Sequence, residues 1–139
     1  MSVLDEFNQG GVKSEMRADI ARIIEAEQAD EPFNNGRTMN ATVSKNTHFE
    51  YAFGSGDEEV VAYLERLDAD TGIELMLWAD EGRFEDAPER FSDCDAELQE
   101  LGESIGRLVV NELDRDNPTH FEYYGAYPPS YVFSATFYI

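Results

Sequence analysis

The sequence predicts an α+β fold, in which an antiparallel sheet has two long helices packed on one face. Two observations support this prediction: apolar residues recur at helical spacing in two separate segments, and they alternate at strand spacing in the segments between and after them. At 139 residues the chain has the size of one domain, and 42% of its residues are hydrophobic. We therefore expect residues 1–139 to fold around a single core.

The first long helix is expected at residues 12–28, after Gly10-Gly11. Its apolar residues fall on one helical face; they are Val12, Met16, Ile20, Ile23 and Ile24. Asp30-Glu31-Pro32 is expected to end this helix, because a proline disfavours helical backbone in the residue before it. Asn34-Asn35-Gly36 then predicts a turn.

Strand patterns occupy residues 38–79. Residues 38–53 are β-like, and Phe49, Tyr51 and Phe53 alternate at their end. Residues 57–67 are open to two interpretations: Val60, Val61, Leu64 and Leu67 fit a helix, whereas the run Val60-Val61-Ala62-Tyr63-Leu64 fits a strand. We favour the strand, because two β-branched residues and a tyrosine stand together.

The clearest strand is residues 73–79, which follow the turn Asp68-Ala69-Asp70-Thr71-Gly72. Ile73, Leu75, Leu77 and Ala79 share one face, and Glu74, Met76 and Trp78 share the other. This alternation predicts that Trp78 is at least partly buried. A charged loop is expected at residues 80–90.

The second long helix is expected at residues 92–113, with Ser92 and Asp93 as candidate caps. Its apolar face contains Cys94, Leu98, Leu101, Ile105, Leu108 and Val109. Gly102 and Gly106 leave a flat strip on which a strand or another chain can pack. After Pro118, strands are expected at residues 120–124 and 131–139, separated by a turn at 125–130.

The charge is strongly negative. Thirty Asp and Glu oppose ten Lys and Arg, which gives a net charge of -20. The acids are spread along the chain, and only two of the basic residues are lysines. Net negative charge disfavours nonspecific binding to nucleic acid and to anionic lipid. The pattern indicates a protein that works in near-saturated salt, where charge repulsion is screened; the alternative is an acidic interaction protein, such as a DNA mimic or inhibitor.

No membrane span and no signal peptide are expected, because no long apolar window occurs and the N-terminal segment contains acids. The lone Cys94 has no cysteine partner for a disulfide or a zinc site, and Asp93 and Asp95 beside it would raise its thiol pKa. We expect it to be a buried structural residue.

Sites for chemistry are scarce. His48-Phe49-Glu50 and His120-Phe121-Glu122 place a histidine and a glutamate on one strand face, which we interpret as solvated surface in preference to a metal site. Asp68 to Gly72 does not match a calcium loop. The established motifs for nucleophilic, phosphate, dinucleotide and zinc-protease sites do not occur. We expect no catalytic residue, no metal and no cofactor, so the protein is predicted not to be an enzyme; a small halophilic binding or enzymatic domain using His48 or His120 remains an alternative.

Residues 121–139 are rich in aromatic side chains and end on Phe137-Tyr138-Ile139. An apolar end of this kind is expected to be a paired and covered strand. It is either internal to the sheet or at a subunit border, where aromatic residues are favoured. The candidate interface residues are Tyr131, Phe133, Phe137, Tyr138 and Ile139.

The order of elements resembles the tail-terminator, or tail-completion, proteins of long-tailed double-stranded DNA viruses. The matching stretches are residues 12–28, 60–64, 72–79, the helix with Leu98, Leu101, Ile105 and Leu108, and residues 131–139. Residues 38–53 and 80–90 depart from the family pattern.

The resemblance implies a ring-forming virion subunit, typically hexameric, that caps the tail tube and joins it to the neck and capsid connector. Its partners would be copies of itself, tail-tube proteins and neck proteins, and genomic DNA would pass through an acidic lumen without specific binding. With the acidic composition, it implies a halophilic virus whose particles assemble in the host cytoplasm.

Overall fold

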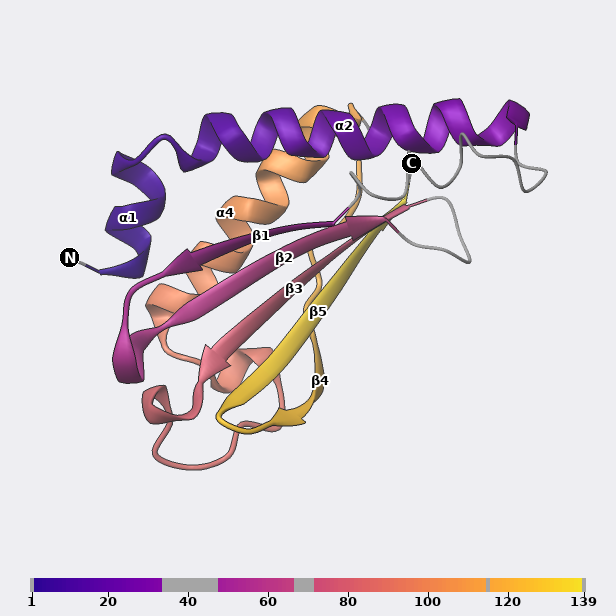
Figure 1. Cartoon of the computed structure of the whole chain (residues 1–139). Helices are drawn as coiled ribbons and strands as arrows, with labels where there is room; N and C mark the ends of the chain where they lie inside the picture. The colour runs from indigo at the N-terminus through magenta and orange to yellow at the C-terminus, as the bar shows by residue number, and fades with distance from the viewer. Residues whose placement is uncertain (1, 34–47, 67–71, 115, 139) are drawn as a thin grey trace.

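A five-stranded antiparallel sheet forms the centre of the structure, a computed structural model (Figure 1). The strands are β1 (His48–Phe53), β2 (Val60–Arg66), β3 (Gly72–Asp80), β4 (Glu122–Tyr127) and β5 (Ser130–Tyr138), and their order across the sheet is β1-β2-β3-β5-β4. The structure describes residues 2–33, 48–66, 72–114 and 116–138, with the backbone alone for residues 26–33. The predicted α+β class and antiparallel sheet are confirmed.

One face of the sheet is apolar and buried. The register places Leu64 of β2 opposite Leu75 of β3, and Leu75 opposite Ala135 of β5, so their side chains form a row across this face. All three residues are buried, as are Ile73 and Phe137 in the neighbouring row. Period-two alternation therefore supplies one continuous apolar layer for the helices.

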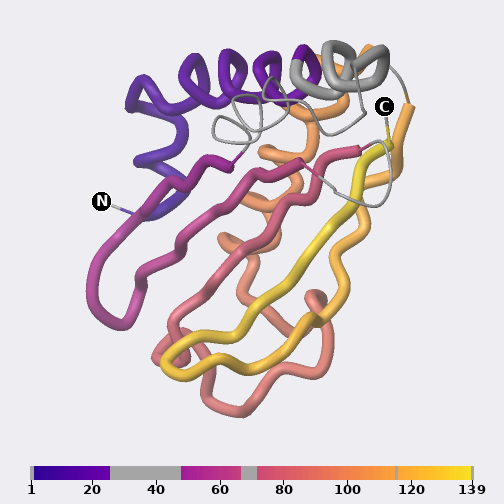
Figure 2. Tube along the Cα trace, turned by 45° about the vertical axis from the view of Figure 1, so that its right-hand side comes forward, coloured from indigo at the N-terminus to yellow at the C-terminus, as the bar shows by residue number. Residues whose placement is uncertain are grey.

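Buried residues of the helices α1 (Val3–Gln9), α2 (Val12–Phe33) and α4 (Ala96–Leu113) belong to the same core cluster as this layer. In Figure 2, α4 runs behind the sheet and α2 crosses the end of the molecule near it. Met16 and Ile20 of α2 and Leu98 and Leu101 of α4, which were predicted as apolar helix positions, are fully buried. None of the helices in the described parts of the chain combines the length and hydrophobicity needed to span a bilayer.

Helix α1 has no counterpart among the helices predicted from the sequence. Its seven residues include only a few apolar positions, of which Val3 and Phe7 are buried. Ser2 and Asp5 form a capping box, in which each side chain accepts a hydrogen bond from the backbone N–H of the other residue. This local motif sets the start of a helix that is too short to show a clear period.

Several predicted boundaries were wrong by a few residues. Helix α2 continues through Pro32 to Phe33, so the proline falls in the last turn, where it removes one intrahelical hydrogen bond and only one helical residue follows it. Helix α4 begins at Ala96 with Asp95 as its N-cap, while the predicted caps belong to a preceding 3-10 turn (Phe91–Asp93). The Asp95 side chain accepts a hydrogen bond from Leu98 N at 3.1 Å.

The predicted strand at residues 57–67 is confirmed as β2, preceded by a short 3-10 turn (Gly56–Glu58). The strand expected at 120–124 is β4 (Glu122–Tyr127), so the turn is confined to Pro128 and Pro129 between paired Tyr127 and Ser130. The predictions for residues 38–47, the turn at 34–36 and most of the turn at 68–72 lie outside the described residues.

The flat strip predicted at Gly102 and Gly106 is covered by other side chains of the same chain. A Cβ atom at Gly102 would meet Phe121 and Phe91 ring atoms, both at 2.9 Å, and one at Gly106 would meet the Thr119 side chain at 2.6 Å. The segment that leads from α4 to β4 therefore packs directly on the helix backbone.

Candidate interaction surface

The second face of the sheet combines polar and aromatic side chains, and we call it the open face. Successive rows across β2, β3 and β5 contain Glu65, Glu74 and Thr136, then Tyr63, Met76 and Ser134, then Val61, Trp78 and Val132. Most of these residues are partly exposed, whereas their neighbours along each strand are buried. The prediction that Trp78, on the face opposite Ile73, Leu75 and Leu77, is at least partly buried is confirmed.

An aromatic ladder crosses the open face from β1 to β4. Its members are His48, Tyr63, Trp78, Tyr127 and Tyr124. Successive ring centroids are separated by 5.5 Å, 5.7 Å, 5.5 Å and 6.0 Å. These spacings lie within the range for favourable ring contacts. The ladder forms a continuous aromatic surface on the side of the sheet that carries no buried apolar layer.

Trp78 lies at the middle of this ladder. Its indole Nε1 is buried and makes no hydrogen bond to any described residue. The Tyr127 ring lies over Gly125 and contacts the Trp78 ring. A Cβ atom at position 125 would come within 3.0 Å of the Tyr127 ring. Gly125 therefore permits the contact between the β4 edge and the sheet centre.

A polar cluster lies beside the ladder, near the end of β2 and the start of β3. Glu65 and Glu74 are directly opposite each other on β2 and β3, and His48 Nδ1 lies 3.3 Å from Glu65 Oε2. Burial raises the pKa of Glu74, and its hydrogen bond and proximity to Glu65 raise it further. The protonated form of Glu74 is therefore favoured at this position.

Strand β4 forms one edge of the sheet and is largely exposed along its length. Tyr124 is 54% exposed and Tyr127 is 45% exposed. A register shift between Tyr123 and Gly125 leaves Tyr124 out of the regular pairing. An exposed edge strand with aromatic side chains can accept another protein chain.

The predicted interface residues occupy different environments. Phe133 and Phe137 are 0% exposed and belong to the core. Tyr131 is partly buried and packs edge-to-face on Phe84, with the ring centroids 5.3 Å apart. Tyr138 is exposed, and Ile139 lies outside the described residues. Of the described members, Tyr138 is thus the one with a largely accessible ring.

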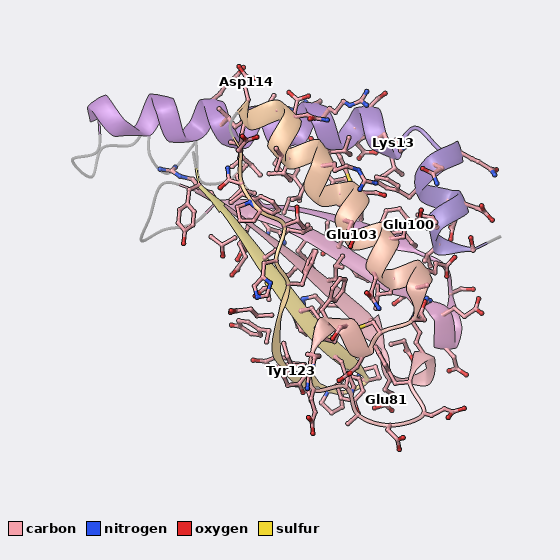
Figure 3. The ribbon with its side chains drawn as sticks, turned by 180° about the vertical axis from the view of Figure 1, so that it is seen from behind. Lys13, Glu81, Glu100, Glu103, Asp114 and Tyr123 are labelled. Carbon is pink, nitrogen blue, oxygen red and sulfur yellow. The ribbon has the colours of Figure 1, made fainter. Side chains whose placement is uncertain are left out.

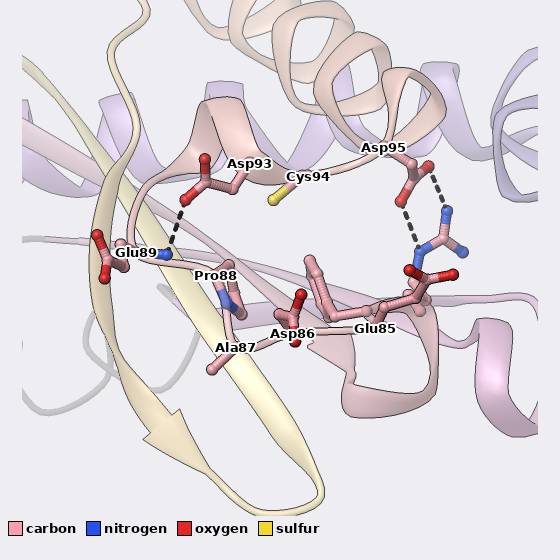
Figure 4. Close-up of a pocket in the computed structure, with 10 residues that line it drawn as sticks. Glu85, Asp86, Ala87, Pro88, Glu89, Asp93, Cys94 and Asp95 are labelled. Carbon is pink, nitrogen blue, oxygen red and sulfur yellow. Dashed lines mark hydrogen bonds and ion pairs between the residues drawn. The ribbon is translucent and has the colours of Figure 1, made fainter.

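A hollow of about 480 Å³ lies beside the loop after β3 and is lined by Glu85, Asp86, Glu89, Asp93 and Cys94, among others (Figure 4). Burial and the neighbouring Asp95 and Asp93 carboxylates raise the pKa of the Cys94 thiol to about 12. The thiol is therefore protonated at neutral pH and is a poor nucleophile. This agrees with the predicted buried structural cysteine.

Arg83 anchors the loop that borders this hollow. Its guanidinium donates hydrogen bonds to Asp95 Oδ2 at 2.8 Å, to Glu97 Oε1 at 3.1 Å and to the Glu58 carbonyl at 2.8 Å. The side chain is only 7% exposed. Charge-assisted bonds to two acids, with little exposure to solvent, hold the loop against the start of α4.

Two other groups of titratable residues lie outside the hollow and the polar cluster. His120 and Glu122 are both well exposed and lie 3.8 Å apart. Asp19, a buried acid on α2, accepts hydrogen bonds from the Tyr51 hydroxyl and from Arg22 Nη1. Burial and the Asp19 carboxylate raise the pKa of Tyr51. Among the described residues, no group of three or more His, Cys, Asp or Glu is placed to hold a metal ion.

Comparison of the chain with protein-family models, with curated protein sequences and with solved structures finds no match. A function for this chain is therefore inferred from its own surfaces.

Proposed function

We propose that the protein is a structural subunit that assembles with copies of itself, and that the open face with the β4 edge is a contact surface in the assembly. The observation that supports this most directly is the aromatic ladder, which extends from β1 to an exposed edge strand. Tyrosine and tryptophan are favoured anchors in protein interfaces because they bury much apolar area and keep one polar group for a hydrogen bond.

The unpartnered Trp78 N–H supports the same proposal. Buried donors are nearly always paired, and an unpaired one costs about 1–3 kcal/mol. An acceptor supplied by a docked chain would remove this cost. In this proposal, both long helices lie on the apolar face of the sheet and leave the open face free for the neighbouring copy.

We further propose, from the resemblance, that the assembly is the ring of a tail terminator or neck in a halophilic virus. In this role the ring, possibly hexameric, would join the tail tube to the capsid connector, and the excess of carboxylates would keep passing DNA from adhering to the lumen. The role requires no catalytic residue and no cofactor.

Light scattering after size-exclusion chromatography, with electron microscopy of the purified chain in 2 M KCl, tests the proposal. We expect a closed ring. Replacing Tyr124 and Tyr127 by serine should shift the population toward folded monomer, and Glu25→Ser, at an exposed site on α2, serves as the control. A wild-type chain that stays monomeric at all concentrations would refute the proposal.

A further inference from the structure

A groove at the junction of α1, α2 and α4 differs in charge from the rest of the molecule. It has a volume of about 290 Å³, and its cationic lining residues are Lys13, Arg17 and Arg107. Glu100 is the one acid among its lining residues. In a chain with 30 acids and 10 basic residues, a site with three cations and one carboxylate is a local reversal of charge. We call this site the basic groove.

The three cations of the basic groove are not neutralised within the described parts of the chain. The Lys13 ammonium lies 5.2 Å from the Phe7 ring centroid, and Arg107 Nη2 donates to Ser104 Oγ at 3.0 Å. None of the ion pairs among described residues involves Lys13, Arg17 or Arg107. By contrast, the buried Arg83 binds two carboxylates. The groove thus offers free positive charge together with neutral hydrogen-bonding groups on Asn8, Ser104 and Asn111.

A complementary acidic surface is present on the same chain. Glu85, Asp86 and Glu89, in the loop after β3, are exposed and make no side-chain hydrogen bond or ion pair with a described residue. We call these three residues the acidic loop. Its backbone is anchored by Arg83 at one end, and near the other end Asp93 accepts hydrogen bonds from Glu89 N and Arg90 N. The carboxylates are therefore held on an ordered loop, which lowers the entropy lost on binding.

The two surfaces lie apart on one molecule. Figure 3 shows Lys13 on α2 at one end of the structure, and Glu81, at the start of the loop, at the opposite end. The acidic loop therefore meets the basic groove of another copy more readily than its own. A contact between two different patches is heterologous, and repeated around an axis it closes into a ring or extends as a filament.

We propose that neighbouring copies of this chain dock head to tail, with the acidic loop of one copy seated in the basic groove of the next. The inference rests on the self-assembly proposed above, and it adds the polar contact that would orient one copy on another. Electrostatic complementarity of this kind sets register and suppresses wrong pairings. Long-range repulsion between two acidic copies is screened by salt, whereas close pairs in a partly buried groove are screened much less.

Charge swapping tests this pairing. One variant reverses the groove (Lys13→Glu, Arg17→Glu, Arg107→Glu), a second reverses the loop (Glu85→Lys, Asp86→Lys, Glu89→Lys), and a third contains all six changes and keeps the wild-type net charge. Sedimentation velocity is measured at the lowest KCl concentration at which circular dichroism shows all chains folded. We expect self-association to be at least tenfold weaker in the groove variant and in the loop variant. Mixing these two chains should give mixed complexes, and the variant with all six changes should recover self-association.

The outcomes separate this inference from the proposed function. If the wild-type chain assembles and both reversed chains assemble equally well, the groove and loop pairing is refuted while self-assembly stands. If both reversed chains lose self-association and the variant with all six changes does not regain it, the pairing is also refuted. A wild-type chain that never assembles refutes both proposals.

Discussion

Phe137 and Tyr138 are adjacent on the last strand but point to opposite faces, so truncating each one separately tests what the strand contributes. Phe137 is fully buried in the core, opposite Ile73, whereas Tyr138 is 50% exposed. Removing a buried phenylalanine side chain costs about 3–5 kcal/mol, since apolar transfer energy is lost and a cavity remains. That is a large fraction of the roughly 5–15 kcal/mol that stabilises a typical domain.

The cost at Tyr138 should be much smaller, about 1–2 kcal/mol, because about half of the side chain is already in water. Its backbone remains held in Tyr138→Ala, since Asn117 Nδ2 donates to the Tyr138 carbonyl at 3.1 Å and Asn117 Oδ1 accepts from Tyr138 N at 3.0 Å. The change therefore removes surface contact and leaves the strand paired.

The assay is urea denaturation followed by circular dichroism at constant KCl, with light scattering on the same samples. We expect Phe137→Ala to unfold at much lower urea, and Tyr138→Ala to remain folded. Equal losses of unfolding free energy in the two variants would refute the assignment of Phe137 to the core and Tyr138 to the surface.

Three further results are expected. Gly102→Ala should destabilise the fold by up to about 2 kcal/mol, because the new methyl group meets two phenylalanine rings at 2.9 Å. The cost of this overpacking exceeds the gain in helix propensity, which is about 1 kcal/mol. As a control, Glu103→Ala at an exposed position should stay within about 0.5 kcal/mol of wild type in the same denaturation assay. The pKa of Glu74 is raised in the folded state, so its contribution to stability is present below the unfolded-state pKa and is lost as pH rises through the folded-state pKa. Glu74→Gln should therefore flatten the dependence of the melting temperature on pH above 4.5, measured by calorimetry, and an unchanged profile would contradict the raised pKa of Glu74. Raising KCl from about 0.1 M to 2 M should raise the melting temperature, because repulsion among the excess acids is screened; a flat or falling melting temperature would contradict adaptation to high salt.

Some elements of the fold could be predicted from the sequence more precisely than others. The faces of α2 and α4 and the alternation of β3 are long and regular, so Leu98 and Leu75 could be assigned to the core directly. The predicted start of α4 was wrong because Ser92, Asp93 and Asp95 are all good caps. In the structure Asp95 caps the helix and also binds Arg83, a contact that the local sequence pattern does not show.

The candidate surface was harder to predict because it depends on the pairing of strands. Tyr63 and Trp78 come together through the register of β2 and β3, and Tyr127 reaches Trp78 across β5. Strand alternation predicts the face of the sheet on which each side chain lies, but it does not predict which side chains of other strands lie next to it. The basic groove likewise joins Lys13 and Arg107 through the packing of helices that are far apart in sequence.

Trp78 has a further consequence for experiments on this protein. It is the one tryptophan in the chain, and it lies between Tyr63 and Tyr127 at the centre of the open face. Its ultraviolet emission therefore arises from a single, known position and receives excitation energy from the tyrosines around it. Docking of a neighbour on the open face would exclude water from the indole and shift its emission to shorter wavelength. The unlabelled protein thus contains its own optical reporter of contact at this surface.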